Sequence, residues 1–110
     1  MGSFVITKRT NGQFQFNLKA GNGQGILASE GYTSKSGCES GIESVIKNSQ
    51  NDERFESKTS SNGKHFFNLK ASNGQIIGTS EMYESSSARD NGIASVKTNA
   101  KDAKIVDQTA

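Results

Sequence analysis

The chain carries few of the side chains on which enzyme chemistry most often depends. Its 110 residues include one cysteine, Cys38, and one histidine, His65. A structural zinc site needs about four cysteine, histidine or carboxylate ligands, and a catalytic Cys-His dyad needs both side chains in contact. The sequence supports neither arrangement, and it contains no glycine-rich phosphate-binding motif. We therefore predict no catalytic residue, no metal site and no cofactor.

Two carboxylates give the strongest argument for an enzyme. Glu30 and Glu81 occupy equivalent positions in two similar halves of the chain. If the fold brought them together, they would form the kind of carboxylate pair that performs general acid-base catalysis. We expect instead that each closes an exposed strand end or pairs with a nearby lysine. A non-catalytic binding module is the preferred function, and an enzyme that uses carboxylate or lysine chemistry is the alternative.

Polar residues that alternate with apolar ones predict a binding surface. From 14 to 20 the odd-numbered residues are polar, so they should face away from the core of a half-buried strand. Asparagine and lysine are poor strand formers, yet both halves carry them at the same two outward positions. The predicted binding surface consists of Asn17, Lys19, Phe66, Asn68 and Lys70. We expect it to contact an unknown protein or a small polar ligand; a merely solvated face is the alternative.

The charge distribution argues against nucleic acid and membranes as partners. Thirteen basic and 11 acidic residues are mixed along the chain and give a net charge of +2. Phosphate binding needs clustered positive charge, so a weak nucleic-acid binder is a secondary alternative. No apolar stretch approaches the roughly 20 residues that span a membrane. A lone cysteine is typical of a reducing compartment, and we predict a cytoplasmic protein.

An internal repeat must position these residues. Residues 4–48 recur without a gap as residues 55–99, and 22 of the 45 positions are identical at an offset of 51. A half of about 50 residues buries too little surface to fold alone, so the two copies should complete one core. We predict a single domain over residues 1–110, made of the two repeats and a C-terminal strand or tail at 103–110. Because the duplication places the contact between halves inside one chain, we also predict a monomer.

Each repeat predicts three strands followed by a helix. Asn11-Gly12 and Asn22-Gly23, repeated as Asn62-Gly63 and Asn73-Gly74, favour the tight turns of an antiparallel meander. Strands are expected at 4–8, 14–20, 25–30, 55–59, 65–71 and 76–81, with a last strand or a frayed tail at 104–107.

The helices are expected near 35–47 and 86–98, where the apolar spacing changes to a helical stripe. Candidate N-caps are Ser34, Ser36, Ser85 and Ser87, and Ser36-x-x-Glu39 has the form of a capping box. Gly41 and Gly92 lie inside these helices, where glycine costs about 1 kcal/mol relative to alanine. Their presence in both copies predicts a close approach of the helix backbone to its neighbours.

The repeated string Asn-Gly-x-x-x-Phe-Asn-Leu-Lys-Ala-x-Asn-Gly-Gln, at 11–24 and 62–75, resembles the YegP family of small bacterial domains. So do the later Ser-Glu-x-Tyr-x-Ser and Gly-Ile-x-Ser-Val strings. The resemblance implies two β3-α-β units in one antiparallel sheet, with their C-terminal strands exchanged. On that plan the strand at 54–59 both ends one unit and opens the next, and 104–107 is its match. The family has no established activity, so the resemblance implies a fold and no function.

The overall prediction is an α+β fold in which two β3-α(-β) repeats form one antiparallel sheet with both helices on one face and pseudo-twofold symmetry. The expected core residues are Phe4, Ile6, Phe14, Phe16, Leu18, Ile26, Ile42, Val45, Phe55, Phe67, Leu69, Ile77, Ile93 and Val96.

Overall fold

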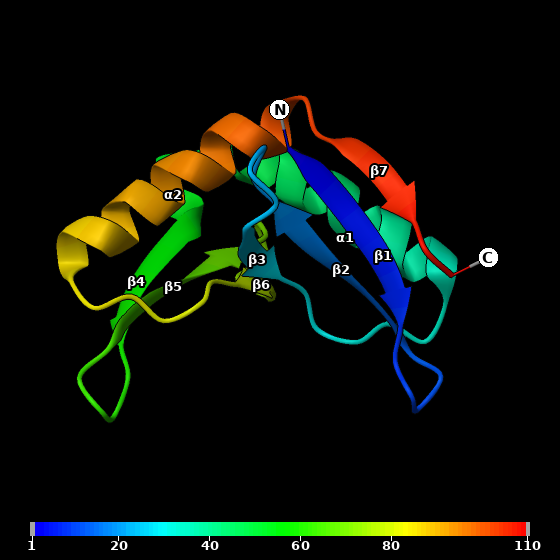
Figure 1. The fold of residues 1–110 in the computed structure, drawn as a ribbon, viewed down its shortest axis with the longest axis horizontal. Helices are drawn as coiled ribbons and strands as arrows, with labels where there is room; N and C mark the ends of the chain where they lie inside the picture. The colour runs from blue at the N-terminus through cyan, green and yellow to red at the C-terminus, as the bar shows by residue number, and fades with distance from the viewer. Residues whose placement is uncertain (1, 110) are drawn as a thin grey trace.

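The computed structural model describes residues 2–109, which form two helices and a seven-stranded sheet (Figure 1). The strands are β1 (Ser3–Lys8), β2 (Phe14–Lys19), β3 (Gly25–Ala28), β4 (Phe55–Thr59), β5 (His65–Lys70), β6 (Ile76–Thr79) and β7 (Lys104–Asp107). The helices are α1 (Lys35–Asn48) and α2 (Ser86–Lys101), and a 3₁₀ turn, η1 (Asp52–Arg54), precedes β4. The strand order is β4-β5-β6-β3-β2-β1-β7, so the two repeats lie side by side in one sheet.

The four Asn-Gly dipeptides form the expected turns between antiparallel strands. Their glycines have φ values between +84° and +86°, which glycine adopts without the steric cost that a Cβ would bring. The asparagines close the turns through their side chains. For example, Oδ1 of Asn11 and of Asn22 accepts a hydrogen bond at 3.0 Å from the backbone N–H two residues later.

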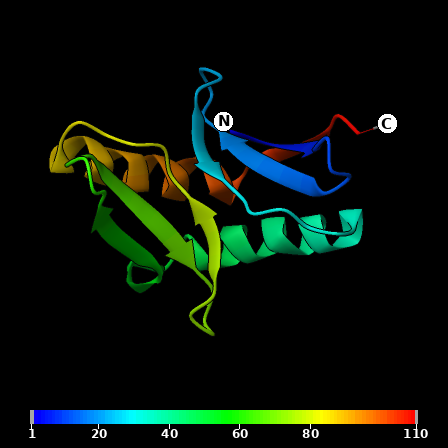
Figure 2. The same ribbon diagram turned by 90° about the horizontal axis from the view of Figure 1, so that it is seen from below.

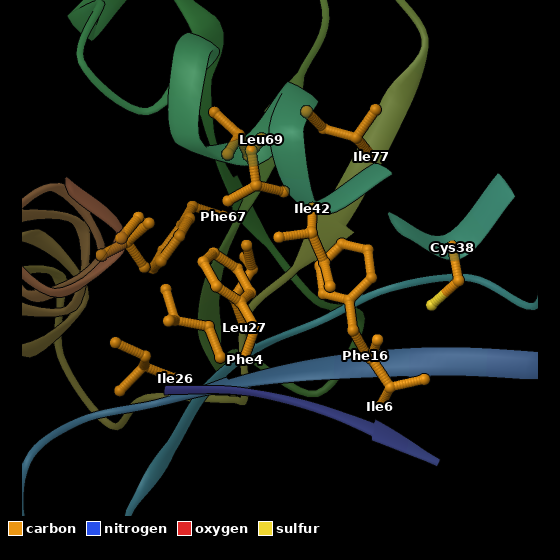
Figure 3. Close-up of a cluster of buried hydrophobic side chains, with 14 residues drawn as sticks. Phe4, Ile6, Phe16, Ile26, Leu27, Cys38, Ile42, Phe67, Leu69 and Ile77 are labelled. Carbon is orange, nitrogen blue, oxygen red and sulfur yellow. The ribbon is translucent and has the colours of Figure 1, made fainter. Parts of the chain in front are cut away.

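One hydrophobic core lies between the sheet and the two helices, and Figure 3 shows part of it. Most of the predicted core residues are buried; Phe14, Phe55 and Ile93 are partly exposed and pack against the cluster. Residues that we did not place in the core also contribute to it: Leu27, Cys38 and Ala100. In Figure 3 the Cys38 thiol points inward, toward Phe16 and Ile6.

The helices begin where two serines cap them. Oγ of Ser34 accepts a hydrogen bond from the N–H of Gly37 at 3.0 Å, and Oγ of Ser85 accepts one from Ala88 at 3.1 Å. Ser36 and Ser87 lie within the first turns, so the predicted capping box at Ser36 is wrong. The chain is still extended at Ser34, where φ is −134° and ψ is 153°, and this geometry suits an N-cap.

The helix glycines lie against aromatic rings, so the close approach that their repetition predicted is made to side chains. A Cβ at Gly41 would overlap the hydroxyl of Tyr32, and one at Gly92 would overlap that of Tyr83. Each tyrosine stacks on the buried phenylalanine of the neighbouring strand, with ring centroids 6.2 Å apart in the first repeat and 6.4 Å in the second. Equivalent contacts therefore recur in both halves.

The strands at 25–30 and 76–81 are shorter than predicted. β3 ends at Ala28 and β6 at Thr79, because the next residue in each repeat is a buried serine that bonds to the neighbouring strand. Oγ of Ser29 accepts a hydrogen bond from the N–H of Phe16 at 2.9 Å, and Ser80 repeats this contact with Phe67 at 3.0 Å.

The two edges of the sheet differ, and one of them corrects the prediction of a wholly antiparallel sheet. β7 pairs with β1 in parallel, with Ser3 opposite Lys104 and Ile6 opposite Asp107. A crossover helix allows this pairing because it returns the chain to the end of the sheet at which an earlier strand begins. Here α2 brings Lys104 to the start of β1, where its N–H donates to the carbonyl of Gly2 at 3.2 Å. At the other edge, among the described residues, β4 pairs only with β5.

The two halves of the sheet meet at a narrow seam. β3 and β6 are joined by one residue pair, Ala28 opposite Thr79, whereas the hairpins on either side are paired along their length. Figure 2 shows β3 and β6 at the centre, with the β1–β2 hairpin and the β4–β5 hairpin diverging from them. Among the described strands, the pairing of neighbours is therefore least extensive at this seam.

Candidate functional site

The predicted binding surface lies on the sheet face opposite the core. Asn17 and Lys19 alternate along β2 with a buried phenylalanine and a buried leucine, and Asn68 and Lys70 do the same along β5. Phe66 precedes them on β5 and is half-buried. The structure thus places the five residues on one face, on two strands separated by β3 and β6.

Side chains of the second repeat are held by neighbours within the sheet. Asn68 is only 7% exposed, and its Oδ1 accepts a hydrogen bond from Oγ1 of Thr79 at 2.9 Å. Nζ of Lys70 lies 3.0 Å from Oε2 of Glu56 on β4. The hydrogen bond from Lys70 holds the pKa of the Glu56 carboxyl below its usual value. These two polar groups therefore already have partners.

The equivalent side chains of the first repeat are more available. Within residues 2–109, neither Asn17 nor Lys19 forms a side-chain hydrogen bond or ion pair. The reason for the difference at asparagine is visible in the strand register. Thr79 lies opposite Asn68, and Ala28, the equivalent of Thr79, lies opposite Asn17. An alanine offers no hydroxyl, so the amide of Asn17 lacks the partner that Asn68 has.

A pocket of about 200 Å³ opens beside Asn17 at the seam between the two halves. Its lining includes Asn17, Gly25, Ala28, Thr79 and Glu81. Of this group, only Asn17 was predicted from its place in the sequence to be part of a binding surface. The pocket thus joins a predicted residue of the first repeat to residues of the second that were not predicted with it.

Differences between the repeats explain why the pocket forms in this place. Gly25 has no side chain, and a Cβ built on it would meet nothing within 4 Å; its equivalent in the second repeat is Ile76, which is 42% exposed. Leu27 of the first repeat is equivalent to Gly78 of the second, and the two residues also contact each other across the seam. A Cβ on Gly78 would lie 2.7 Å from a methyl carbon of Leu27. The signal that could have revealed the pocket is therefore this exchange of glycine for a large apolar residue at equivalent positions.

The two carboxylates considered for catalysis, Glu30 and Glu81, do not both line the seam pocket. Glu81 lines it, whereas Glu30, Tyr32 and Tyr83 do not. Both tyrosines lie on the helix side of the sheet against the glycines of α1 and α2. Burial, with a smaller contribution from the carboxylate two residues earlier, raises the pKa of each tyrosine above its usual value. Neither phenol is thereby prepared to act as a base near neutral pH.

The single histidine and the single cysteine lie on different elements of the fold. His65 is on β5, and its buried Nδ1 has no hydrogen-bond partner among the described residues. Cys38 is on α1 and fully buried; burial raises the pKa of its thiol. Within residues 2–109 no group of three or more His, Cys, Asp or Glu side chains is arranged to hold a metal ion. None of the helices described there is long and apolar enough to cross a membrane.

Comparison with known proteins identifies relatives along nearly the whole chain. It is 56% identical over 106 residues to the "UPF0339 protein in ptx operon 5'region" of Stutzerimonas stutzeri, which covers 96% of both chains. It is 55% identical over 108 residues to the "UPF0339 protein YegP" of Escherichia coli K12, which covers 98% of both. These descriptions name no specific activity.

Two structures solved in solution by NMR share the fold. The UPF0339 protein of Shewanella oneidensis superposes with a TM-score of 0.93 at 55% identity, over 98% of this chain and 92% of that one. The E. coli protein yegP, described as a protein of unknown function, superposes with a TM-score of 0.94 at 54% identity, over 99% and 94%. The family described as a domain of unknown function, DUF1508, matches residues 10–56 and again residues 60–107. The resemblance to YegP is therefore confirmed, and the chain belongs to the DUF1508 family, with two copies of its domain.

Proposed function

We propose that this protein is a small non-catalytic binding module whose contact surface is the outward sheet face, centred on the seam pocket. The observation that carries the proposal is the contrast between two equivalent asparagines. Thr79 donates to Asn68, whereas Asn17 faces Ala28 and has an available amide beside a pocket. If the outward face were only solvated, there would be no reason for Asn17 to line a pocket while Asn68 is held by Thr79.

The pocket is suited to a small polar group. Its polar side chains are those of Asn17, Thr79, Ser80 and Glu81, and Gly25, Leu27 and Ala28 supply uncharged walls. The Thr79 hydroxyl already donates to Asn68 and the Ser80 hydroxyl to the carbonyl of Glu81, so the Asn17 amide and the Glu81 carboxylate are the groups left for a ligand. Glu81 favours a group that donates hydrogen bonds, and the Asn17 amide can both donate and accept. Lys19 pairs with Gly25 across the strands and lies next to this site. The partner is a small polar ligand, or a protein that inserts a polar side chain here.

The proposal treats the chain as a monomer in the cytoplasm, with the two repeats related by a pseudo-twofold axis. The covalent joining of the repeats supports the monomer, because each half contributes strands to one sheet and side chains to one core. The enzyme alternative has less support, since Glu81 lines the seam pocket without Glu30. Mixed charges leave nucleic acid the weakest partner class.

NMR chemical-shift mapping tests the proposal with blocked arginine, glutamine and glutamate as simple probes of cationic, neutral and anionic groups. We expect the arginine and glutamine derivatives to shift the amide signals of Asn17, Ala28 and Thr79 saturably. The glutamate derivative should have a smaller effect, because Glu81 repels it.

Two substitutions taken from the second repeat provide matched controls. Ala28→Thr gives Asn17 the hydroxyl that Asn68 has, and Gly25→Ile fills the pocket without meeting another atom at Cβ. Both should remove the shifts and leave the fold intact. Shifts confined to the helix side of the molecule, or shifts unchanged in both variants, would contradict the proposal.

A further inference from the structure

The outer edge of β4 is equivalent to the outer edge of β1. The repeat relates Phe4 to Phe55 and Ile6 to Ser57, and both strands pair antiparallel with the next strand of their own repeat. On β1 this edge is covered by β7. On β4 no strand follows among the described residues, as the strand order and Figure 1 show. One molecule thus contains both an occupied and an open example of the same edge.

The occupied edge shows which backbone groups a bound strand uses. The N–H of Gln108 donates to the carbonyl of Ile6 at 2.9 Å, so Ile6 directs its backbone groups toward β7. Ser57 is the equivalent residue on β4, and its backbone groups therefore face the open edge. The N–H of Phe55 is already satisfied by the carbonyl of Asp52 in η1. The first free N–H group of the edge is consequently that of Ser57.

The occupied edge also shows where an acidic side chain goes. Asp107 lies opposite Ile6 at the end of β7, and its carboxylate is 2.7 Å from Nζ of Lys35 at the start of α1. Cys38 lies one turn further along α1, and in Figure 3 its thiol points toward Ile6, the residue opposite Asp107. An aspartate in this register therefore faces the first turns of the helix that covers the edge.

In the second half of the molecule, the residue equivalent to Cys38 is Arg89, on α2. Its side chain is 15% exposed, and among the described residues its only acidic partner is the adjacent Asp90, 3.4 Å away and 64% exposed. This distance is long for a charged hydrogen bond, which usually measures about 2.7–2.9 Å. A carboxylate placed beside β4 as Asp107 is placed beside β1 would meet this arginine.

We propose that the edge of β4 binds an extended segment of a partner polypeptide as an additional parallel strand, with an aspartate or glutamate opposite Ser57 that pairs with Arg89. The pattern is that of β7, in which an apolar residue stands two positions before the acid, as Ile105 does before Asp107. The site is separate from the outward face and its pocket, so it does not depend on the function proposed above.

A second copy of this chain is a poorer occupant. If two molecules joined through β4 with their helices on the same side, the side chains next to Arg89 would come from Phe55, Ser57 and Thr59 of the second copy. These residues include no carboxylate. An acidic segment from another protein satisfies both the backbone edge and the arginine.

The test is an NMR titration of the intact protein with a blocked synthetic peptide of residues 103–109, which contains the β7 pattern. We expect saturable shifts of the amide signals from Ser57 to Thr59 and of the Arg89 side-chain N–H. A peptide with Asn in place of Asp107 should bind about tenfold more weakly, since it loses the charged partner of Arg89.

Two variants of the protein separate the backbone from the side-chain contribution. Ser57→Pro removes the outward N–H and should abolish binding, with Ser57→Ala as its control. Arg89→Cys, which installs the residue of the first repeat, should weaken binding about tenfold, while Lys101→Ala on the same helix should not. The dispersion of each spectrum reports folding, and the Arg89 variant and the Asn peptide give independent tests if the proline variant unfolds.

Several results would overturn the inference. Shifts confined to β1 would show that the peptide competes with β7. Equal binding of the Asp and Asn peptides would remove the role of Arg89. Absence of saturable shifts up to about 1 mM peptide would leave no binding at this edge. Shifts of β4 that depend on protein concentration without peptide would identify a second copy as the occupant.

Discussion

The two outer edges of the sheet begin from equivalent residues and have diverged according to what covers them. On β1, Val5 is 7% exposed and lies opposite Val106 of β7, and Ile6 is fully buried. At the same positions β4 carries Glu56, whose side chain is 37% exposed, and Ser57, which is also exposed. Apolar residues are retained where a seventh strand removes water, and charged or small residues stand where the edge stays open. The residue types at these positions therefore follow the local surroundings and not the equivalence of the two repeats.

Core-facing residues of the same two strands show the opposite behaviour. Phe4 packs edge-on against Phe16 with ring centroids 5.7 Å apart, and Phe55 packs against Phe67 at the same distance. Both halves direct these rings into one core. Where both copies meet the same surroundings, the residues have stayed the same, so the two halves should be equivalent in the core and different at the edges.

The largest expected effect tests this equivalence in the core. Phe16→Ala and Phe67→Ala each remove a fully buried ring, and each should lower the free energy of unfolding by about 3–5 kcal/mol. Denaturant unfolding followed by circular dichroism measures both. Phe66→Ala, on the outward face, should cost much less. A loss below about 1 kcal/mol for one core variant beside a full loss for the other would show that the halves are not equivalent.

A smaller effect distinguishes the two edges. Val5→Glu places a carboxylate on the edge that β7 covers, and burial of this charge should cost about 2–3 kcal/mol. Glu56→Val makes the reciprocal change on the exposed edge and should alter stability by less than about 0.5 kcal/mol. It removes a charge from an open strand edge, so it should promote self-association, which sedimentation detects. Equal destabilisation by the two substitutions would show that β7 does not seal its edge in solution.

The smallest effect concerns how acid acts on the two edges. The hydrogen bond from Lys35, followed by bonds from Thr109, holds the pKa of Asp107 well below its usual value of 3.8. Because the pKa is lowered in the folded state, the stabilisation is present above about pH 4 and is lost as the pH falls through the folded value. In Lys35→Ala the pKa of Asp107 should rise toward its usual value, as a carboxyl titration by NMR would record. Glu56, held by Lys70 at the other edge, should titrate as before; a parallel change in Glu56 would mean that the edges are coupled.

Much of the fold could be predicted from local patterns. The Asn-Gly turns, the alternation along β2 and β5 and the caps at Ser34 and Ser85 all depend on residues close in sequence. The predicted ends of some elements were wrong where contacts between residues distant in the sequence determine them. α2 extends to Lys101, beyond the predicted residue 98, because Ala100 packs into the core one turn after Val96. Ser29 and Ser80 end their strands by bonding to residues 13 positions away.

The candidate site was predicted only in part for the same reason. Alternation along one strand was enough to place Asn17 and Asn68 on the outward face. It could not show that Asn68 is satisfied by Thr79 and that Asn17 borders a pocket, because these facts depend on the register of β2 with β3 and of β5 with β6. Neither could it associate Glu81 with Asn17, since the two residues meet only across the seam between the repeats.

By itself, the sequence determined that two copies of one unit build a meander and a helix each, because turn chemistry and apolar periodicity act over a few residues. Only the tertiary structure decided how the copies are joined. The parallel position of β7, the open edge of β4 and the pocket between β3 and β6 all arise from contacts between segments far apart in the chain. Repetition leaves those contacts undetermined, since identical units can meet in several ways and the packing of the whole molecule selects one.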